Sequence, residues 1–452
     1  MVKKFLFYLL LLVVSATLFG CKLSGRVTTP NGDPVSGVTL TLSGNSNLIA
    51  LTGINGEYSF ALPDEEANYT ITPSKNSYAF NPEQISVEVN QDTPEDGIEG
   101  LDFTGTTTFR KILDGDAYDY ACSVQQTTDG GYIVAGYTAA DAWLIKTDAS
   151  GNAKWKKTWA GTACAYSAQQ TTDGGYIVAG LWLGAGSNEG WLAKTDANGN
   201  EEWSKSWTVT NMNRFNYVQQ TADGGYIVVG DSFLNDTYYD IWVMKTDSSG
   251  NEEWRKIWGG DNYDFGKYVQ QTTDGGFIIA GSTASYGAGA YDAWLIKTDA
   301  SGNEEWQKTL GGGGEELSYT AQQTSDGGYI VAGKFWIFKT DTAGNEEWNK
   351  RLSSRITHSV KQTSDGGYIL AGTSGGVSDA WLSKIDAGGN EEWQKIFGGS
   401  GYECASSIQP TADGGYVIAG YTWDYVGSDL SKITSESWLI KTNSFGNDFT
   451  QP

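Results

Sequence analysis

The sequence predicts an all-β protein in which a small antiparallel β-sandwich is followed by a seven-bladed β-propeller. One observation is a unit marked by Asp-Gly-Gly, which occurs seven times between residues 106 and 452 at spacings of 39 to 52 residues. A second is the composition, with 59 glycines, 18 tryptophans and 25 tyrosines but only 8 prolines. A third is that residues 21–105 carry short alternating runs and no copy of the unit. Repeats of this length are typical of four-stranded propeller blades, whose tight turns need glycine.

Residues 1–20 are predicted to be a signal peptide and not part of the fold. Two lysines precede an apolar run at residues 5–14, which suits a signal peptide and is too short to span a bilayer. The following Leu-Phe-Gly-Cys21 resembles the lipobox of bacterial lipoproteins, although its phenylalanine is bulkier than the residue usual there. The resemblance implies that Cys21 is acylated and anchors the chain to a membrane, in the cell envelope and outside the cytoplasm. An ordinary secreted protein is the alternative.

Residues 21–105 are predicted to form the sandwich. The runs Gly32-Asp-Pro-Val-Ser-Gly-Val-Thr-Leu40 and Thr52-Gly-Ile-Asn-Gly-Glu-Tyr-Ser-Phe60 place short strands between Gly, Asn and Pro turns. Together with Tyr78-Ala-Phe-Asn-Pro82, this pattern resembles the carboxypeptidase regulatory-like family, a transthyretin-like sandwich. The resemblance implies a spacer or a binding accessory and no peptidase activity.

Each unit from residue 109 onward is predicted to supply four strands, named A to D in chain order. Strand A ends at Gln-Gln-Thr, as at residues 124–127, and strand B is the continuous apolar run after Asp-Gly-Gly, as at 131–136. Strand C carries Trp-Leu-Ile-Lys, as at 142–146, and strand D carries a second tryptophan, as at 201–205. A continuous apolar run suits a strand that is covered on both faces. Glycine in the A–B and C–D turns supplies the positive φ that a tight hairpin needs.

The tryptophans of strands C and D are predicted to pack between blades, because each ring buries a large apolar area. They occur as pairs in six units: Trp143 with Trp155, Trp191 with Trp203, Trp242 with Trp254, Trp294 with Trp306, Trp336 with Trp348, and Trp381 with Trp393.

Unit seven has the strand-C tryptophan Trp438 but no tryptophan in the place of strand D. The segment Phe109-Arg-Lys-Ile-Leu113, which precedes the first strand A, has the character of a strand D without a unit of its own. We therefore expect residues 109–113 to complete the last blade. Closing the ring in this way hides the edges that an open sheet would expose.

Two further resemblances concern the repeat. The segment Lys-Thr-Asp-x-x-Gly-Asn-x-x-Trp resembles the tryptophan-docking repeat of quinoprotein-like propellers, but the sequence has no adjacent cysteine pair that would indicate their cofactor site. The whole unit, with Asp-Gly-Gly-Tyr-Ile-Val-Ala-Gly as its most regular part, resembles an uncharacterised bacterial and archaeal repeat family over residues 109–446. These resemblances imply the propeller fold and no particular activity or cofactor.

The chain carries 54 acidic and 30 basic residues, a formal net charge of −24 at pH 7. Removal of residues 1–20 takes away two lysines and leaves a charge of −26. Because neutralising phosphates needs Lys and Arg, this charge argues against a nucleic-acid partner. It is compatible with cations, neutral sugars or basic proteins.

Beyond Cys21, the chain has three cysteines near the start of strand A, in units one, two and seven: Cys122, Cys164 and Cys404. An odd number leaves at least one free thiol. Those units are neighbours in a closed ring. Two interpretations therefore stay open: one disulfide between two of these cysteines, or three buried thiols.

The A–B and C–D turns are nearly uniform, whereas the B–C and D–A connections differ from unit to unit and lie on the opposite face of the disc. Loops can vary without disturbing the sheets, so the irregular face is the predicted binding face. Ten residues before Asp-Gly-Gly, four units carry acids that we expect to ring the mouth of the central channel: Asp119, Asp264, Glu316 and Glu403. The aromatic candidates on this face are Tyr120, Tyr239, Tyr263 and Trp423.

Aromatic faces beside carboxylates suit a carbohydrate, and the same surface suits a protein. Both ligands stay open, together with a face that binds nothing and only solvates the propeller. A divalent cation at the acidic mouth is a further option. The turn Asp196-Ala-Asn-Gly-Asn200 resembles the start of a calcium loop, but it lacks the glycine and the closing glutamate of such loops, so a hairpin turn is the better interpretation.

No catalytic site is predicted. His358 is the only histidine, which excludes a His-rich metal site and weakens any catalytic triad. The Glu-Glu pairs before the strand-D tryptophans lie on outer strands, where we expect them to pair with lysines and keep blade edges apart. The prediction is a non-enzymatic binding or scaffold lipoprotein of the cell envelope. A polysaccharide-active enzyme with acids at the channel mouth and an envelope assembly factor are the alternatives, and the oligomeric state stays open.

Overall fold

The computed structural model describes residues 21–62, 66–94, 96–114, 118–139, 141–161, 163–184, 187–209, 212–234, 238–375, 378–399, 401–425 and 433–448. The predicted signal peptide lies outside the described residues. All regular structure in the described part is β-strand, and no helix there is long and apolar enough to cross a membrane. The chain divides into two compact units, Met1–Thr106 and Thr107–Pro452, one residue from the predicted boundary.

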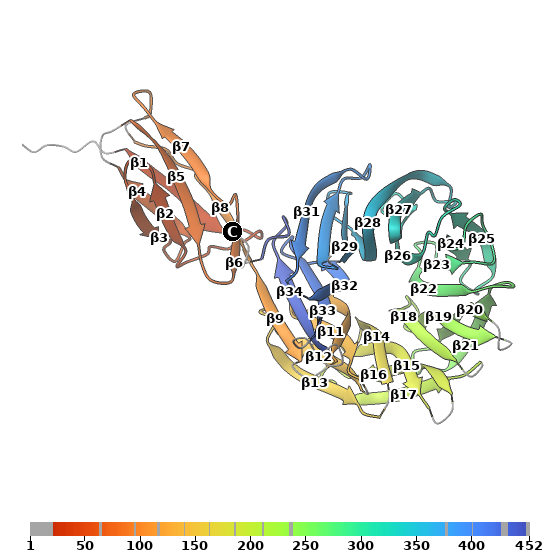
Figure 1. Ribbon diagram of the computed structural model, residues 1–452. Helices are drawn as coiled ribbons and strands as arrows, with labels where there is room; N and C mark the ends of the chain where they lie inside the picture. The colour runs from red at the N-terminus through yellow and green to blue at the C-terminus, as the bar shows by residue number, and fades with distance from the viewer. Residues whose placement is uncertain are drawn as a thin grey trace, which may run out of the picture. The chain divides into compact units, whose positions relative to one another are not determined.

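The first unit is a sandwich of two four-stranded sheets (Figure 1). One sheet has the order β4(Glu57–Ala61), β1(Lys22–Thr28), β8(Phe103–Thr107), β6(Tyr78–Asn81), and the other has the order β3(Leu48–Leu51), β2(Thr39–Ser43), β5(Ala67–Ser74), β7(Ile85–Val89). Its core includes Leu23, Val27, Leu40, Tyr69 and Phe103.

One ladder of the sandwich departs from the predicted antiparallel pattern. β1 pairs antiparallel with β4 but parallel with β8. The physical reason is the connection: the chain leaves the second sheet after β7 and crosses to the first sheet before β8 begins, which allows β8 to run in the same direction as β1.

The second unit is a ring of four-stranded blades (Figure 1). Blades one to four follow the predicted order of strands A to D: β10(Tyr120–Gln126), β11(Tyr132–Tyr137), β12(Ala142–Thr147), β13(Ala153–Trp159); β14(Ala163–Gln170), β15(Tyr176–Leu183), β16(Asn188–Thr195), β17(Glu201–Trp207); β18(Asn213–Gln220), β19(Tyr226–Leu234), β20(Tyr238–Thr246), β21(Glu252–Trp258); β22(Asp264–Gln271), β23(Phe277–Thr283), β24(Asp292–Thr298), β25(Glu304–Leu310).

Blades five and six share one six-stranded sheet, because their connections are so short that the strands run on. β27 pairs with β26 over Tyr329–Gly333 and with β28 over Trp336–Thr340, so it supplies strands B and C around a bend at Phe335, whose φ is 69°. β28 supplies strand D of blade five and, over Arg355–Gln362, strand A of blade six. The described residues therefore contain seven blades, as predicted. The strands of this sheet are β26(Ser318–Gln323), β27(Tyr329–Thr340), β28(Glu346–Gln362), β29(Tyr368–Ser374), β30(Ala380–Ile385) and β31(Glu391–Phe397).

Blade seven takes its fourth strand from the start of the propeller sequence. β32(Tyr402–Pro410), β33(Tyr416–Tyr425) and β34(Ile433–Thr442) are its strands A to C, and β9(Phe109–Asp114) pairs antiparallel with β34 as strand D. Phe109 lies opposite Lys441, where blades one to six pair a lysine with the strand-D tryptophan, and its ring lies 5.8 Å from that of Tyr132. The predicted closure is confirmed.

The strand-D aromatic rings pack between blades in one repeated contact. The ring of Trp155 lies 5.6 Å from that of Tyr176, the first residue of the next strand B. Each ring also covers the glycine of the next C–D turn, because a methyl group on Gly199 would lie 2.8 Å from Trp155. That glycine has a φ of 82°, so both the turn and the packing require it. The ring contact recurs in Phe109–Tyr132, Trp203–Tyr226, Trp254–Phe277, Trp306–Tyr329, Trp348–Tyr368 and Trp393–Tyr416.

The two glutamines at the end of strand A tie neighbouring blades together. Oε1 of Gln125 accepts a hydrogen bond from the backbone N–H of Gln170 at 2.6 Å. Oε1 of Gln170 accepts one from the backbone N–H of Thr128 at 2.9 Å. Among the described residues, both bonds are present at six of the seven interfaces between blades and form a glutamine belt around the ring axis.

Candidate functional site

The four acids predicted to ring the channel mouth are buried: Asp119, Asp264, Glu316 and Glu403. Oδ2 of Asp264 accepts hydrogen bonds from the backbone N–H of Gly260 at 3.0 Å and from the hydroxyl of Ser285 at 2.7 Å. Strand-A residues of all seven blades line an axial cavity, and none of the four acids is among the described residues that do so. The four acids therefore do not line the axial cavity, and their placement at its mouth stays a prediction. The carboxylate of Asp264 thus connects the D–A loop that precedes blade four with the B–C loop of that blade.

Asp264 lies close to a second carboxylate, that of Asp240 in strand C of the preceding blade. Burial and the neighbouring charge of Asp264 raise the pKa of Asp240 to about 6. Oδ1 of each residue is buried and has no hydrogen-bond partner among the described residues. The two acids form a like-charge contact that opposes folding when both are ionised.

The structure offers little support for the predicted cation. In the described part of the chain, no group of three or more His, Cys, Asp or Glu side chains is arranged to hold a metal ion. The carboxylate of Asp196 already accepts hydrogen bonds from the backbone N–H groups of Asn198 and Asn200, at 2.8 and 2.9 Å, which confirms the hairpin interpretation of that turn. No disulfide joins Cys122, Cys164 and Cys404 in the described part of the chain.

The predicted aromatic residues fall into two separate clusters. Tyr239 and Tyr263 come together with ring centroids 6.5 Å apart, and Tyr239 also lies 5.7 Å from Phe265. Tyr120 belongs to a second cluster on blades one and seven, where its ring lies 4.8 Å from that of Tyr421. Trp423 joins this second cluster through Tyr402, with ring centroids 5.9 Å apart.

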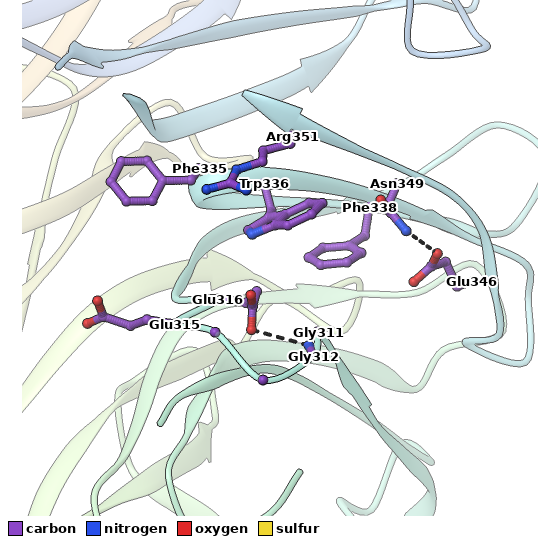
Figure 2. A pocket seen from close by; sticks show the side chains of 12 residues that line it. Gly311, Gly312, Glu315, Glu316, Phe335, Trp336, Phe338, Glu346, Asn349 and Arg351 are labelled. Carbon is purple, nitrogen blue, oxygen red and sulfur yellow. Dashed lines mark hydrogen bonds between the residues drawn. The ribbon is translucent and has the colours of Figure 1, made fainter. Parts of the chain in front are cut away.

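A cleft of about 530 Å³ lies between blades four and five. One wall is aromatic, formed by Phe335, Trp336 and Phe338, and the glycine-rich loop of residues 311–314 lies across the gap (Figure 2). Polar groups at the cleft are Glu315, Glu316, Glu346, Asn349 and Arg351. Of the eight predicted ligand-binding residues, Glu316 lines this cleft. The volume of the cleft is in the range of about 300–1,000 Å³ that is usual for small-ligand sites.

Three departures from the repeat open this cleft. In blade four, Tyr286 of the B–C loop covers the strand-C tryptophan Trp294 at 5.2 Å, whereas in blade five the B–C loop is only a turn. The preceding strand D ends in Leu310, where the first three blades end in a tryptophan. The following loop, Gly311–Gly314, brings no side chains into the gap. Trp336 is consequently only half-buried.

The ring of Trp336 lines the cleft and is contacted by two neighbouring side chains. Its ring stacks with that of Phe338, with centroids 6.1 Å apart and planes at 19°, and the guanidinium of Arg351 lies 5.8 Å from its centroid. In Figure 2 the two rings lie side by side, and Glu316 lies across the gap. A flat ring with donors and acceptors around it can stack on the apolar face of a sugar and bind its hydroxyl groups.

Every carboxylate of the cleft already has a partner. Glu315 forms an ion pair with Lys334 at 2.6 Å, and Glu316 accepts a hydrogen bond from the backbone N–H of Gly312 at 3.3 Å. Glu346 accepts one from the side-chain amide of Asn349. These contacts fix acceptors in place, which favours binding over proton transfer.

Sequence reasoning missed Trp336 because it grouped this residue with the packing tryptophans. A signal was present, since the spacing of 39 residues between Asp326 and Asp365 is the shortest of the seven. A short loop suggests less surface for a ligand, whereas here the missing loop uncovers the ring beneath it.

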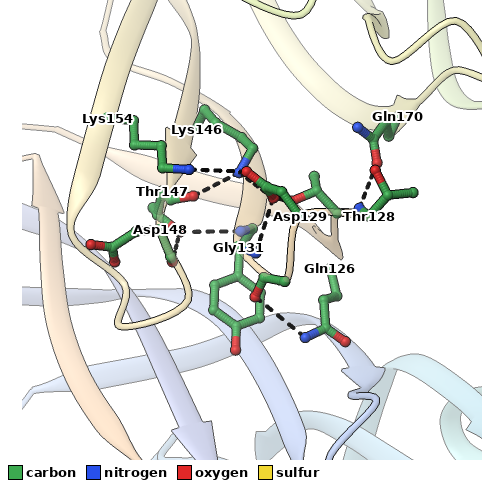
Figure 3. A network of polar contacts seen from close by, with 12 residues as sticks. Gln126, Thr128, Asp129, Gly131, Lys146, Thr147, Asp148, Lys154 and Gln170 are labelled. Atoms are coloured by element: carbon green, nitrogen blue, oxygen red, sulfur yellow. Dashed lines mark hydrogen bonds and ion pairs between the residues drawn. The ribbon is translucent and has the colours of Figure 1, made fainter.

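The residues that all units share are used by the fold. The carboxylate of Asp129 accepts a hydrogen bond from the backbone N–H of Gly131 at 3.1 Å and one from the ammonium of Lys146 at 2.9 Å (Figure 3). The equivalent Asp–Lys ion pair is present in all seven blades. In five blades the second Glu of Glu-Glu-Trp also pairs with this buried lysine, as predicted. The shared Asp, Lys and Glu side chains therefore stabilise the fold.

Comparison with known families supports the sandwich. Residues 22–96 match the carboxypeptidase regulatory-like domain family. This match confirms the resemblance seen in the sequence of that segment. No curated protein matches the chain.

Solved structures resemble the fold. They include Sqt1 from Chaetomium thermophilum bound to the N-terminus of the ribosomal protein L10, at 12% identity over 74% of this chain and 98% of that chain, with a TM-score of 0.45. YCF48 bound to D1 peptide follows at 10% identity over 74% and 94%, with a TM-score of 0.44. A puromycin hydrolase mutant complexed with PGG has 14% identity over 75% and 53%, with a TM-score of 0.49. These likenesses concern the fold alone.

Proposed function

We propose that this chain is a lipid-anchored protein of the cell envelope that binds a neutral carbohydrate, without cleaving it, in the cleft between blades four and five. The observation that carries the proposal is the exposure of Trp336. The strand-C tryptophans of the other six blades are all buried, whereas Trp336 is only half-buried and lines the cleft.

The charge of the cleft favours a neutral sugar over an acidic one. Glu315, Glu316 and Glu346 line it, against the single guanidinium of Arg351. The chain as a whole carries a net charge of −24, which also repels anions from its surface. Carboxylates at fixed positions accept hydrogen bonds from sugar hydroxyl groups.

A binding protein fits the cleft better than a glycoside hydrolase. Hydrolysis of a glycosidic bond needs a protonated carboxylic acid and a free carboxylate on opposite sides of the bond. Here Glu315 is held by an ammonium group and Glu316 by a backbone amide. We therefore expect no release of reducing sugar from any oligosaccharide that binds.

The test measures binding of the full chain to xylohexaose, mannohexaose, cellohexaose, maltohexaose and chitohexaose by calorimetry. We expect at least one of these sugars to bind and Trp336→Ala to weaken its affinity at least tenfold, which corresponds to about 1.4 kcal/mol. Trp423→Ala is the matched control, because this tryptophan is 36% exposed and lies outside the cleft, on blade seven. The proposal fails if none of the five sugars binds, or if Trp336→Ala binds as tightly as the wild type.

The anchor has its own test. If Cys21 is acylated, cells fed a labelled fatty acid should incorporate the label into the full chain, which should sediment with membranes. Cys21→Ser should lose the label and move to the soluble fraction. A wild-type chain that carries no label would contradict the anchor and leave the ordinary secreted protein as the better account.

A further inference from the structure

The axial cavity has a charge opposite to that of the chain around it. Its volume is about 310 Å³, and residues of strand A from all seven blades line it. Two lysines, Lys267 and Lys361, and the histidine His358 face this cavity, and no aspartate or glutamate is among the described residues that line it. In a chain with a net charge of −24, this is a local reversal of sign. A cavity lined by charges of one sign concentrates ligands of the opposite sign.

Part of this positive charge is balanced within the fold. Nζ of Lys267 lies 3.3 Å from Oδ2 of the buried Asp231, and the guanidinium of Arg214 lies 2.8 Å from the same oxygen. The side-chain amide of Asn216 donates a hydrogen bond to it at 3.0 Å. Two cations thus share one carboxylate, which leaves one positive charge in excess at this group.

Lys361 has no carboxylate partner among the described residues. Its Nζ lies 5.3 Å from the ring centroid of Tyr268, which belongs to strand A of blade four, while Lys361 belongs to blade six. The ring of Tyr268 lies 4.4 Å from that of Tyr217, so two phenols and one ammonium group come together in the cavity. The hydroxyl groups of Tyr217 and Tyr268 share one hydrogen bond, so the ammonium of Lys361 and one phenolic proton are the donors left for a ligand.

The sequence shows that Lys361 replaces a structural residue. In the other six blades the same position is the belt glutamine: Gln125, Gln169, Gln219, Gln270, Gln322 and Gln409. The N–H that would meet a glutamine at this interface is also missing, because the residue there is Pro410. The interface between blades six and seven has therefore lost both partners of one belt bond. This change releases a side chain that points across the cavity instead of along the belt.

We infer that the axial cavity binds a small anion, whose carboxylate or phosphate group is held by the ammonium of Lys361 and the hydroxyl group of Tyr268, which Tyr217 supports through its own hydrogen bond. The glutamines and serines of the remaining strands supply further hydrogen-bonding groups for the uncharged part of the ligand. This site is distinct from the carbohydrate cleft between blades four and five. Either site can exist without the other.

The experiment titrates the full chain with inorganic phosphate, succinate and glucuronate by calorimetry, at constant ionic strength in sodium chloride. We expect saturable binding of at least one of these anions, and the comparison between phosphate and the two carboxylates identifies the charged group. Lys361→Gln should weaken that binding at least tenfold, and Tyr268→Phe, which keeps the ring, should weaken it several-fold. Because glutamine already stands at this position in six blades, Lys361→Gln is compatible with the fold.

Lys156→Gln is the matched control, because it makes the same change in charge at an exposed position on the outer strand β13. It should bind the anion as the wild type does. The inference is overturned if none of the three anions binds saturably, or if Lys361→Gln and Lys156→Gln bind equally well.

Discussion

Asp240 shows that an aspartate at one position of the repeat can be hydrogen-bonded in one blade and lie beside a second acid in another. In blade one the same strand-C position is Asp141, whose Oδ1 accepts a hydrogen bond from the backbone N–H of Gly161 at 2.9 Å. The residue of blade two that corresponds to Asp264 is Ala163, so Asp141 meets no second acid there. In blade three Asp240 lies beside Asp264, and its pKa rises to about 6.

We expect Asp240→Asn to raise the melting temperature at about pH 7.5 and not at about pH 4. An aspartate whose folded-state pKa is raised binds its proton more tightly in the folded chain than in the unfolded chain, where the pKa is about 3.9. Its contribution is therefore most favourable below about pH 4 and is lost as the pH rises to about 6. Asp141→Asn, measured in the same thermal unfolding series, should show no such gain. An equal gain for Asp240→Asn at both pH values would contradict the like-charge contact.

At the scale of elements, the spacing of the repeat in the sequence predicted most of the strands and their order. The Asp-Gly-Gly spacing predicted the blades. The missing strand D after Trp438, together with the extra strand-D segment at 109–113, predicted how the ring closes. The direction of side chains along strand A was not predictable. Every strand A has a register shift, as between Ala121 and Ser123, and such an irregularity breaks the alternation of sides. The sequence therefore could not show that the acids near the start of strand A are buried and absent from the lining of the axial cavity.

The closing strand β9 should be one of the most sensitive elements of the ring. Phe109 is 5% exposed and takes the place of the strand-D tryptophan of blade seven. Phe109→Ala should lower the free energy of unfolding by about 3–5 kcal/mol, because it leaves a cavity between blades seven and one. Ile112→Ala on the same strand is the control, since Ile112 is 55% exposed and should change stability little. Urea unfolding followed by tryptophan fluorescence measures both. Equal effects of the two variants would show that β9 does not depend on this contact.

At the scale of the whole molecule, the ring is nearly regular and its two candidate sites are local exceptions. The very short B–C turn of unit five is one of the departures that open the cleft, and the lysine that replaces a glutamine in unit six adds positive charge to the cavity. The sequence comparison of units indicated that function should lie where the copies differ. It could not show which of the differing residues lie close together in the fold. Gly311 and Arg351, and likewise Lys361 and Tyr268, come together only when the blades are arranged in the ring.

Hydrogen–deuterium exchange of the full chain, with and without the oligosaccharide that binds most tightly among the five hexasaccharides, tests the carbohydrate site most directly. The account predicts slower exchange at residues 311–316 and 334–351, which frame the cleft, and unchanged exchange at the Asp-Gly-Gly turns. Protection confined to the Asp-Gly-Gly turns or to residues 22–96, with none at the cleft, would contradict it.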